Sequence, residues 1–353
     1  MKKITQLFLL FLTTISFSQV TDVKDPLNGT PTGFLLVGNE LYYTHDNSIS
    51  KLDTSIANPS PVNIINGLNE PTGLLLNGND LYFAQATANK VSKIDITNPT
   101  PTVVDVVTGL NEPAFLALSG NDLFISEVGD GKISKIDITA SLPTTTTDVV
   151  LGLNTPLGIT LNGNDLYIAE VLANKVSKID ISNPAPTAVN VATGFNKPLQ
   201  LAINGNDLYI SEPDGNKISK VDITASLPTT PTDVLTGLGS PEVLVANTTD
   251  LYFSADSSVG AGYKISKLNF AALATESFQD SSLQVYPNPV ENQLYLPEST
   301  TFRNYELYDI TGKQVQQGKI LLNTISFSEI NSGIYVLKLL GQNLEKSIKV
   351  IKK

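Results

Sequence analysis

The sequence predicts an all-β protein, and three observations support this fold class. Prolines that follow Gly/Asn-rich turns recur every 40 to 43 residues, at Pro31, Pro71, Pro113, Pro156, Pro198 and Pro241. Each proline begins a unit of four short apolar stretches that show no helical periodicity. The last part of the chain, after residue 282, alternates apolar and polar residues between turn signals.

The four stretches of a unit predict four strands. The first follows the proline and is apolar at almost every position, as in PTGLLL and PLGITL. A polar turn, a Leu-Tyr or Leu-Phe stretch and a KVSKID-like stretch come next, and a fourth stretch such as Pro101–Val107 leads to the next proline. Six units of this period, with four strands each, are typical of a six-bladed β-propeller, which we expect over residues 19–270.

Closure of the ring requires a complete last blade. The sixth unit, Gly237–Phe270, contains three predicted strands. Val20–Val23 precedes the first unit where a fourth strand is missing, so we expect an N-terminal strand at about 20–24 to complete the last blade. Units two and three match units four and five as pairs, which indicates that a two-blade segment was duplicated.

Both ends of the chain predict export. Residues 1–18 have two lysines, an apolar run and small residues before Gln19, as in a cleaved signal peptide. The apolar run at 4–15 is shorter than the ~20 residues that span a bilayer, so no transmembrane anchor is expected. Residues 271–282 are small and polar, as in a linker. Residues 283–353 then predict a small C-terminal antiparallel β-sandwich.

The charge and the rare residue types exclude several functions. Residues 19–280 hold 13 basic and 28 acidic side chains, and such a surface disfavours nucleic acid and anionic membranes while it attracts cations. The chain has one histidine and no cysteine. A His/Cys zinc site is therefore excluded, Cys-His catalysis has no nucleophile, and a Ser-His-Asp triad could use only His45 as its base.

Polar residues gather in the loops on one predicted face of the propeller. The loops that lead into first strands and the loops that leave second strands open on the same face, around the central channel. Three glutamates and three asparagines there predict a Ca²⁺ site, because calcium takes several oxygen ligands: Glu127, Glu170, Glu212, Asn111, Asn154 and Asn196. His45, Gln85, Glu70 and Glu112 are candidate ligand contacts on the same face. The alternative is that all of these are repeat-derived loop residues on a solvated surface.

The order PxG, NDLY and NK[IV]xKxD resembles the NHL-repeat and SMP-30/gluconolactonase-like six-bladed propellers over roughly residues 22–270. The resemblance implies a metal held by Glu, Asn and Asp at the channel mouth, which polarises a substrate in the lactonases. This chain departs from that family because it lacks tryptophan and has no distinctive aspartate for the role of a base.

The C-terminal residues resemble the type A sorting domain of the type IX secretion system of Bacteroidota. The matching motifs are YPNP (286–289), YDITGK (308–313), SGIYVLK (332–338) and the basic end KVIKK (349–353). The residues that carry the resemblance are Tyr286, Pro287, Asn288, Pro289, Gly312, Lys313, Gly333 and Tyr335. The resemblance implies that the secretion machinery is a partner and that the protein is extracellular or attached to the outer surface.

The leading hypothesis is a secreted or cell-surface propeller that binds an extracellular protein, glycan or small molecule through its acidic channel face. The alternative is a Ca²⁺-dependent hydrolase of the SMP-30/gluconolactonase kind. A polysaccharide lyase or glycosidase is disfavoured by the missing tryptophan platforms and by the lack of one distinctive carboxylate pair.

Overall fold

The computed structural model describes residues 20–27, 29–257, 262–271, 285–296, 302–309, 313–341 and 345–353. The predicted signal peptide, residues 272–282 of the predicted linker and Gly312 lie outside the described residues. The chain divides into two compact units, one that ends at Leu273 and one that begins at Ala274. No helix in the described ranges is long and apolar enough to cross a bilayer.

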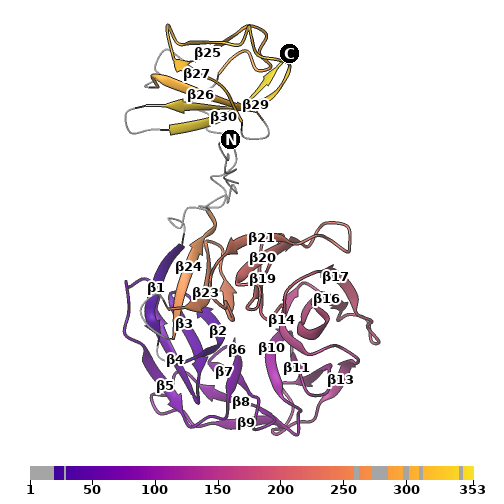
Figure 1. The fold of residues 1–353 in the computed structure, drawn as a ribbon. Helices are drawn as coiled ribbons and strands as arrows, with labels where there is room; N and C mark the ends of the chain where they lie inside the picture. Colours follow the sequence, from indigo (N-terminus) through magenta and orange to yellow (C-terminus); the bar gives the residue numbers. More distant parts are fainter. Residues whose placement is uncertain are drawn as a thin grey trace, which may run out of the picture. The chain divides into compact units, whose positions relative to one another are not determined.

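The first unit consists of six four-stranded antiparallel sheets arranged in a ring (Figure 1). We number these sheets as blades 1 to 6 in chain order. The first strands are β2 (Pro31–Val37), β6 (Pro71–Asn77), β10 (Pro113–Ser119), β14 (Pro156–Asn162), β18 (Leu201–Asn204) and β22 (Leu244–Ala246). The second strands are β3 (Glu40–His45), β7 (Asp80–Gln85), β11 (Asp122–Glu127), β15 (Asp165–Glu170), β19 (Asp207–Glu212) and β23 (Asp250–Asp256).

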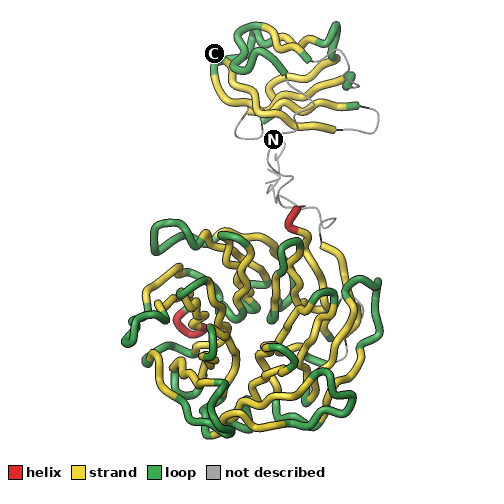
Figure 2. Tube along the Cα trace, turned by 180° about the vertical axis from the view of Figure 1, so that it is seen from behind, coloured by secondary structure: helices red, strands yellow, loops and turns green. Residues whose placement is uncertain are grey.

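The outer half of each blade is built in the same way. The third strands are β4 (Ser48–Asp53), β8 (Lys90–Asp95), β12 (Lys132–Asp137), β16 (Lys175–Asp180), β20 (Lys217–Asp222) and β24 (Tyr263–Asn269). The fourth strands are β5 (Val62–Asn66), β9 (Val104–Thr108), β13 (Thr147–Val150), β17 (Val189–Thr193), β21 (Thr232–Thr236) and, in blade 6, β1 (Val20–Leu27). Figure 2 shows that strands and loops make up almost all of this unit, with the short 3₁₀ turn η2 (Val171–Ala173) in blade 4.

The six first strands form the inner ring, in which each contacts the next and β22 contacts β2. This explains their apolar character, because a first strand packs against neighbouring blades as well as its own. Thr32 Oγ1 donates to the carbonyl of Pro71 at 2.7 Å, and Thr72 Oγ1 donates to the next blade at the same distance. At Gly158 a Cβ atom would lie 2.5 Å from the Leu199 carbonyl oxygen, so the absence of a side chain permits the close approach of blades 4 and 5.

Strand β1 lies on the outer edge of blade 6 and pairs antiparallel with β24, from Val20 opposite Leu268 to Leu27 opposite Tyr263. The first and last segments of the propeller are therefore hydrogen-bonded in one sheet. The strand is longer than the expected range of about 20–24. Val23 and Leu27 are buried in a cluster with side chains of blades 1 and 6, which ties the N-terminal strand to the core on both sides of the closure.

The second unit contains two antiparallel sheets around one apolar core, in agreement with the predicted small β-sandwich. The larger sheet has the order β27 (Gln314–Lys319), β26 (Asn304–Asp309), β29 (Gly333–Leu340), β30 (Glu345–Lys352), and the smaller pairs β25 (Gln293–Tyr295) with β28 (Thr324–Ser326). Leu294 and Ile325 of the smaller sheet share the buried cluster with Leu307 and Leu337 of the larger one.

Candidate functional site

The upper face of the propeller is the face that carries the loops into each first strand and the loops from each second to each third strand. The predicted site residues lie at two positions of this face. One is the last residue of a second strand, which we name the exit residue: His45, Gln85, Glu127, Glu170 and Glu212. The other is the Asn-X-Pro turn before a first strand, with Asn69, Asn111, Asn154 and Asn196.

The exit glutamates are buried inside their own blades. Glu127, Glu170 and Glu212 have at most 2% of their surface exposed, because the Asn-X-Pro turn folds over them. In each case Oε2 accepts a hydrogen bond from the backbone N–H of the turn asparagine: Asn111 (3.0 Å), Asn154 (3.0 Å) and Asn196 (2.7 Å). The sequence-predicted pairs of glutamate and asparagine are therefore brought together, but through the backbone of the asparagine.

The second carboxylate oxygen is used within the blade as well. Glu170 Oε1 accepts from Ser177 Oγ at 2.7 Å and lies 3.1 Å from Lys175 Nζ. Glu212 Oε1 accepts from Ser219 Oγ and lies 3.6 Å from Lys217 Nζ. In blade 3 Glu127 Oε1 has no hydrogen-bond partner among the described residues and lies 3.6 Å from Nζ of the equivalent lysine, Lys132.

This arrangement does not fit a shared calcium ion at the predicted residues. A hard cation needs several oxygens that converge on one point. Within the described residues, no group of three or more Asp, Glu, His or Cys side chains is placed to hold a metal ion. The oxygens of Glu170 and Glu212 instead satisfy backbone and hydroxyl donors, and each carboxylate faces an ammonium group. The exit glutamates thus act as buried anchors of the upper-face turns.

The exit residues of blades 1 and 2 lie at the position equivalent to the exit glutamates, but they are a histidine and a glutamine. Gln85 Oε1 accepts from the N–H of Asn69 at 3.0 Å, and Gln85 Nε2 donates to Ser92 Oγ at 2.8 Å. His45 hydrogen-bonds through Nε2 to Ser50 Oγ at 2.9 Å and stacks on Tyr43. The neutral glutamine therefore reproduces the contacts of the buried glutamates without a charge.

The middle residue of each Asn-X-Pro turn has a positive φ angle, which holds its side chain at the tip of the turn. Glu70 (φ 46°) and Glu112 (φ 51°) are exposed on neighbouring blades. The N–H of Glu112 donates to Asn89 Oδ1 of blade 2 at 3.0 Å, which fixes the turn against the neighbouring blade. Among the described residues, no ion pair involves either carboxylate, so both can meet a ligand.

A third carboxylate on this face was missed by the sequence analysis. Glu242 precedes β22 and is half-buried beside Tyr263, whose hydroxyl donates to Glu242 Oε1 at 3.0 Å. Burial raises the pKa of the Glu242 carboxyl, the tyrosine hydrogen bond opposes this, and the Asp256 charge adds to it. Burial, helped by Glu242, raises the pKa of Tyr263 to about 12. The signal in the sequence was the departure from the repeat, because the equivalent residues are Thr32, Thr72, Ala114, Leu157 and Leu199.

The sorting-motif residues lie in the second unit, where the YPNP segment contacts the C-terminal strand. Asn288 Oδ1 accepts from the N–H of Ile351 at 2.9 Å, and Val290 exchanges backbone hydrogen bonds with the C-terminal end. Tyr286 is exposed and stacks on Tyr295. Three further motif residues have structural contacts: the N–H of Lys313 donates to Asp309 Oδ1 at 3.0 Å, Gly333 begins β29, and the hydroxyl of buried Tyr335 donates to the Asn331 carbonyl.

Comparison with known proteins agrees with this division into two parts. Residues 284–353 match the family described as the secretion system C-terminal sorting domain. A comparison with curated protein sequences gives no match. The solved structures similar to the propeller share 10 to 20% sequence identity with it, which establishes the fold and leaves the activity open.

Three of these structures illustrate the range. Virginiamycin B lyase from Staphylococcus aureus has 16% identity and a TM-score of 0.53, with 71% of this chain and 98% of that chain covered. The luciferin-regenerating enzyme has 10% identity and a TM-score of 0.55, with 70% and 94% covered. A chain of a nidogen–laminin complex has 14% identity and a TM-score of 0.54, with 61% and 85% covered.

These findings define the class: an all-β chain in which a β-propeller precedes a sorting domain. In particular, the propeller is similar to lyase, NHL-like and dehydrogenase propellers, and the C-terminal unit is similar to the tail of type IX secretion cargo. The recognition of both parts from sequence motifs is confirmed.

Proposed function

We propose that this chain is a binding protein that the type IX secretion system exports to the cell surface or the medium. Its ligand would carry positive charge and would bind the acidic upper face of the propeller. The observation that supports this most directly is the division of the upper-face carboxylates into two sets. The exit glutamates are buried and hydrogen-bonded within their blades, whereas Glu70 and Glu112 are exposed at turn tips with positive φ.

The geometry of the two exposed carboxylates favours recognition over catalysis. Each follows an anchored asparagine and precedes the proline that begins an inner strand, so its backbone is fixed before a ligand arrives. A preorganised carboxylate binds a cationic group with a smaller loss of conformational entropy. The strongly acidic propeller adds a long-range attraction that increases the association rate at low salt.

The test is titration of the full-length mature chain with a fluorescent oligolysine peptide at low salt. The double variant Glu70→Gln, Glu112→Gln should bind about five- to tenfold more weakly, since each exposed ion pair contributes up to about 1 kcal/mol. The matched control is Glu291→Gln, which removes an exposed carboxylate from the second unit. Equal affinity of the double variant and the wild-type chain would exclude the upper face as the binding surface.

Export is tested separately in a bacterium that has the secretion system. The chain without residues 284–353 should stay inside the cell envelope, whereas the full chain should reach the surface or the medium. Detection of the truncated chain outside at the wild-type level would contradict the assigned role of the tail.

A second candidate function is hydrolysis, and Glu242 is the observation that favours it. A half-buried carboxyl group with a raised pKa beside a tyrosine hydroxyl is suited to donate or accept a proton at a substrate. A lactone and ester panel should then show turnover that Glu242→Gln removes and Glu70→Gln preserves. Absence of turnover by the wild-type chain over the whole panel would leave binding as the function.

A further inference from the structure

The six blades differ at their outer edges in a regular way. In every blade the register between the third and fourth strands shifts at one equivalent place, and β1 has a second shift between Lys24 and Leu27. The residues bulged at the equivalent place are Val23, Ile64, Val106, Val149, Val191 and Val234. A bulged residue does not pair in its own ladder, so its carbonyl group is available to a neighbour. We use the word seam for the junction between this edge and the loop between the third and fourth strands of the next blade.

At every second seam, a backbone N–H group of the next blade donates a hydrogen bond to the carbonyl of the bulged residue. The N–H of Asn58 donates to the carbonyl of Val23 at 3.1 Å, that of Thr144 to Val106 at 2.9 Å, and that of Thr229 to Val191 at 2.8 Å. The segments that bind Val106 and Val191 have the same sequence, SLPTT, at 141–145 and 226–230. Both run parallel to the strand that they contact. The loops between the third and fourth strands of blades 3 and 5 thus contain strand-like segments docked on the preceding blade.

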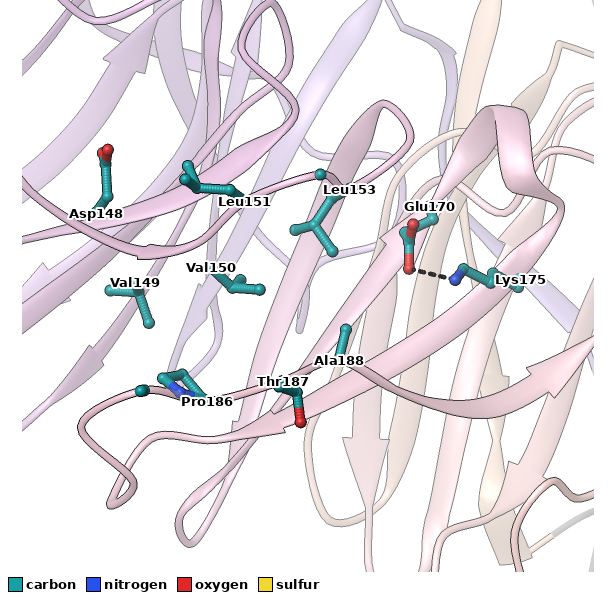
Figure 3. A pocket seen from close by; sticks show the side chains of 12 residues that line it. Asp148, Val149, Val150, Leu151, Leu153, Glu170, Lys175, Pro186, Thr187 and Ala188 are labelled. Atoms are coloured by element: carbon teal, nitrogen blue, oxygen red, sulfur yellow. Dashed lines mark ion pairs between the residues drawn. The ribbon is translucent and has the colours of Figure 1, made fainter.

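The seam between blades 3 and 4 lacks this docked segment. The loop between the third and fourth strands of blade 4 has the sequence ISNPAPT at 181–187, which contains no SLPTT segment. In the part of the chain that the structure describes, no backbone hydrogen bond reaches the carbonyl of Val149 across the seam. A pocket of about 520 Å³ lies here between β13 and the blade 4 loop. Figure 3 shows Val149, Val150, Leu151 and Leu153 on one side of it and Pro186 on the other.

The lining of this pocket indicates an apolar, uncharged occupant. Leu151 is 64% exposed, whereas the equivalent residue of the other fourth strands is Asn66, Thr108, Thr193 or Thr236. The charged side chains at the pocket already have partners within the chain: Asp148 binds Lys132 at 2.9 Å and Glu170 binds Lys175 at 3.1 Å. An occupant therefore gains nothing from its own charge and gains most from apolar contact with Val150 and Leu151.

We propose that the seam between blades 3 and 4 binds an extended, uncharged segment of a partner protein with the pattern proline, threonine, threonine. The N–H of the first threonine donates to the Val149 carbonyl. The segment runs parallel to β13, as Thr144 does opposite Val107, so the second threonine lies beside Leu151 and its methyl group fills part of the pocket. The occupant is inferred from the protein's own solution at the equivalent seams, where the N–H groups of Thr144 and Thr229 donate to the bulged valines. This is strand addition to an exposed sheet edge, and it does not depend on the acidic upper face.

The experiment uses a fluorescent peptide with the sequence of Ile138–Thr146, ITASLPTTT, titrated with the full chain. We expect saturable binding that weakens about tenfold when the first threonine after proline is N-methylated, because methylation removes the donor to Val149. Leu151→Thr, which installs the residue of the other blades, should also weaken binding about tenfold. Leu172→Thr is the matched control, since Leu172 is 63% exposed in blade 4 and does not line the pocket.

A loop graft tests the position of the peptide independently. Replacement of residues 181–187 by ITASLPTT from blade 3 should place a docked segment on Val149 and abolish peptide binding, with a melting temperature at or above that of the wild-type chain. Full peptide binding by the folded graft, or unchanged affinity with Leu151→Thr and with the methylated peptide, would overturn the proposal. An apolar dye that binds equally well to the wild-type chain and to the graft would show an unrelated surface.

Discussion

Glu212 offers a direct test of whether the exit glutamates are structural anchors, because the chain contains its own neutral version in Gln85. Glu212 is fully buried and accepts hydrogen bonds from the N–H of Asn196 and from Ser219 Oγ. Glu212→Ala leaves both donors without this acceptor, and removal of one partner of a buried charged pair costs about 3 to 5 kcal/mol. For a propeller of this size the melting temperature should fall by roughly 6 to 20 °C.

Glu212→Gln should behave differently. The glutamine oxygen can accept from Asn196 and its amide can donate to Ser219, as Gln85 does with Asn69 and Ser92. The remaining loss is the attraction to Lys217, which keeps Asp233 as a partner at 2.7 Å, so we expect a cost of about 1 kcal/mol or less. The assay is thermal unfolding of the full chain with and without EDTA. Equal destabilisation by both substitutions, or an EDTA effect that Glu212→Gln removes, would refute the anchor role and restore the calcium hypothesis.

Three further predictions concern stability. Gly158→Ala should lower the free energy of unfolding by about 1 to 3 kcal/mol, because its methyl group would overpack against Leu199. Gly163→Ala, in an open turn at φ 60°, is the control and should cost about 1 kcal/mol of backbone strain. Equal melting temperatures of the two variants would contradict the tight blade contact. Val23→Ala should cost about 2 kcal/mol in urea unfolding if the N-terminal strand closes the ring. The raised pKa of Glu242 gives a stabilising contribution that is present below the unfolded value of about 4.5 and lost as pH rises through the folded value. Glu242→Gln should therefore raise stability at pH 7 by less than about 1 kcal/mol and leave it unchanged near pH 3.5, and a pH-independent difference between melting curves would contradict this.

The repeat allowed the fold to be predicted from the sequence because each strand has the same signal six times. Asn77-Gly78, for example, predicts a hairpin turn, and the structure has Gly78 at φ 61° between β6 and β7. The sixth unit has only three predicted strands, and an additional strand is predicted near Val20, so the sequence predicts that this strand completes the sixth blade. The sorting domain was recognisable because short motifs such as YPNP occur in a fixed order.

The chemistry of the upper face could not be predicted in the same way. The sequence shows that Glu170 leaves a second strand at the channel face, but not that its carboxylate turns inward to Asn154 and Lys175. That orientation depends on the turn that covers the side chain and on the neighbouring third strand, and both are tertiary features. Glu242 was missed for a related reason, because alignment of the repeats draws attention to shared residues rather than to the one that differs.

The pairing of β1 with β24 has a consequence for how the molecule is made. The two strands are separated by more than 200 residues, so a chain that emerges N-terminus first cannot join them until nearly the whole propeller is available. A product that ends before Tyr263 would lack β24. Val23 and Leu27 would then lose packing partners, and the other five blades would not be closed into a ring. Closure of the propeller therefore depends on a single strand pair between its two ends.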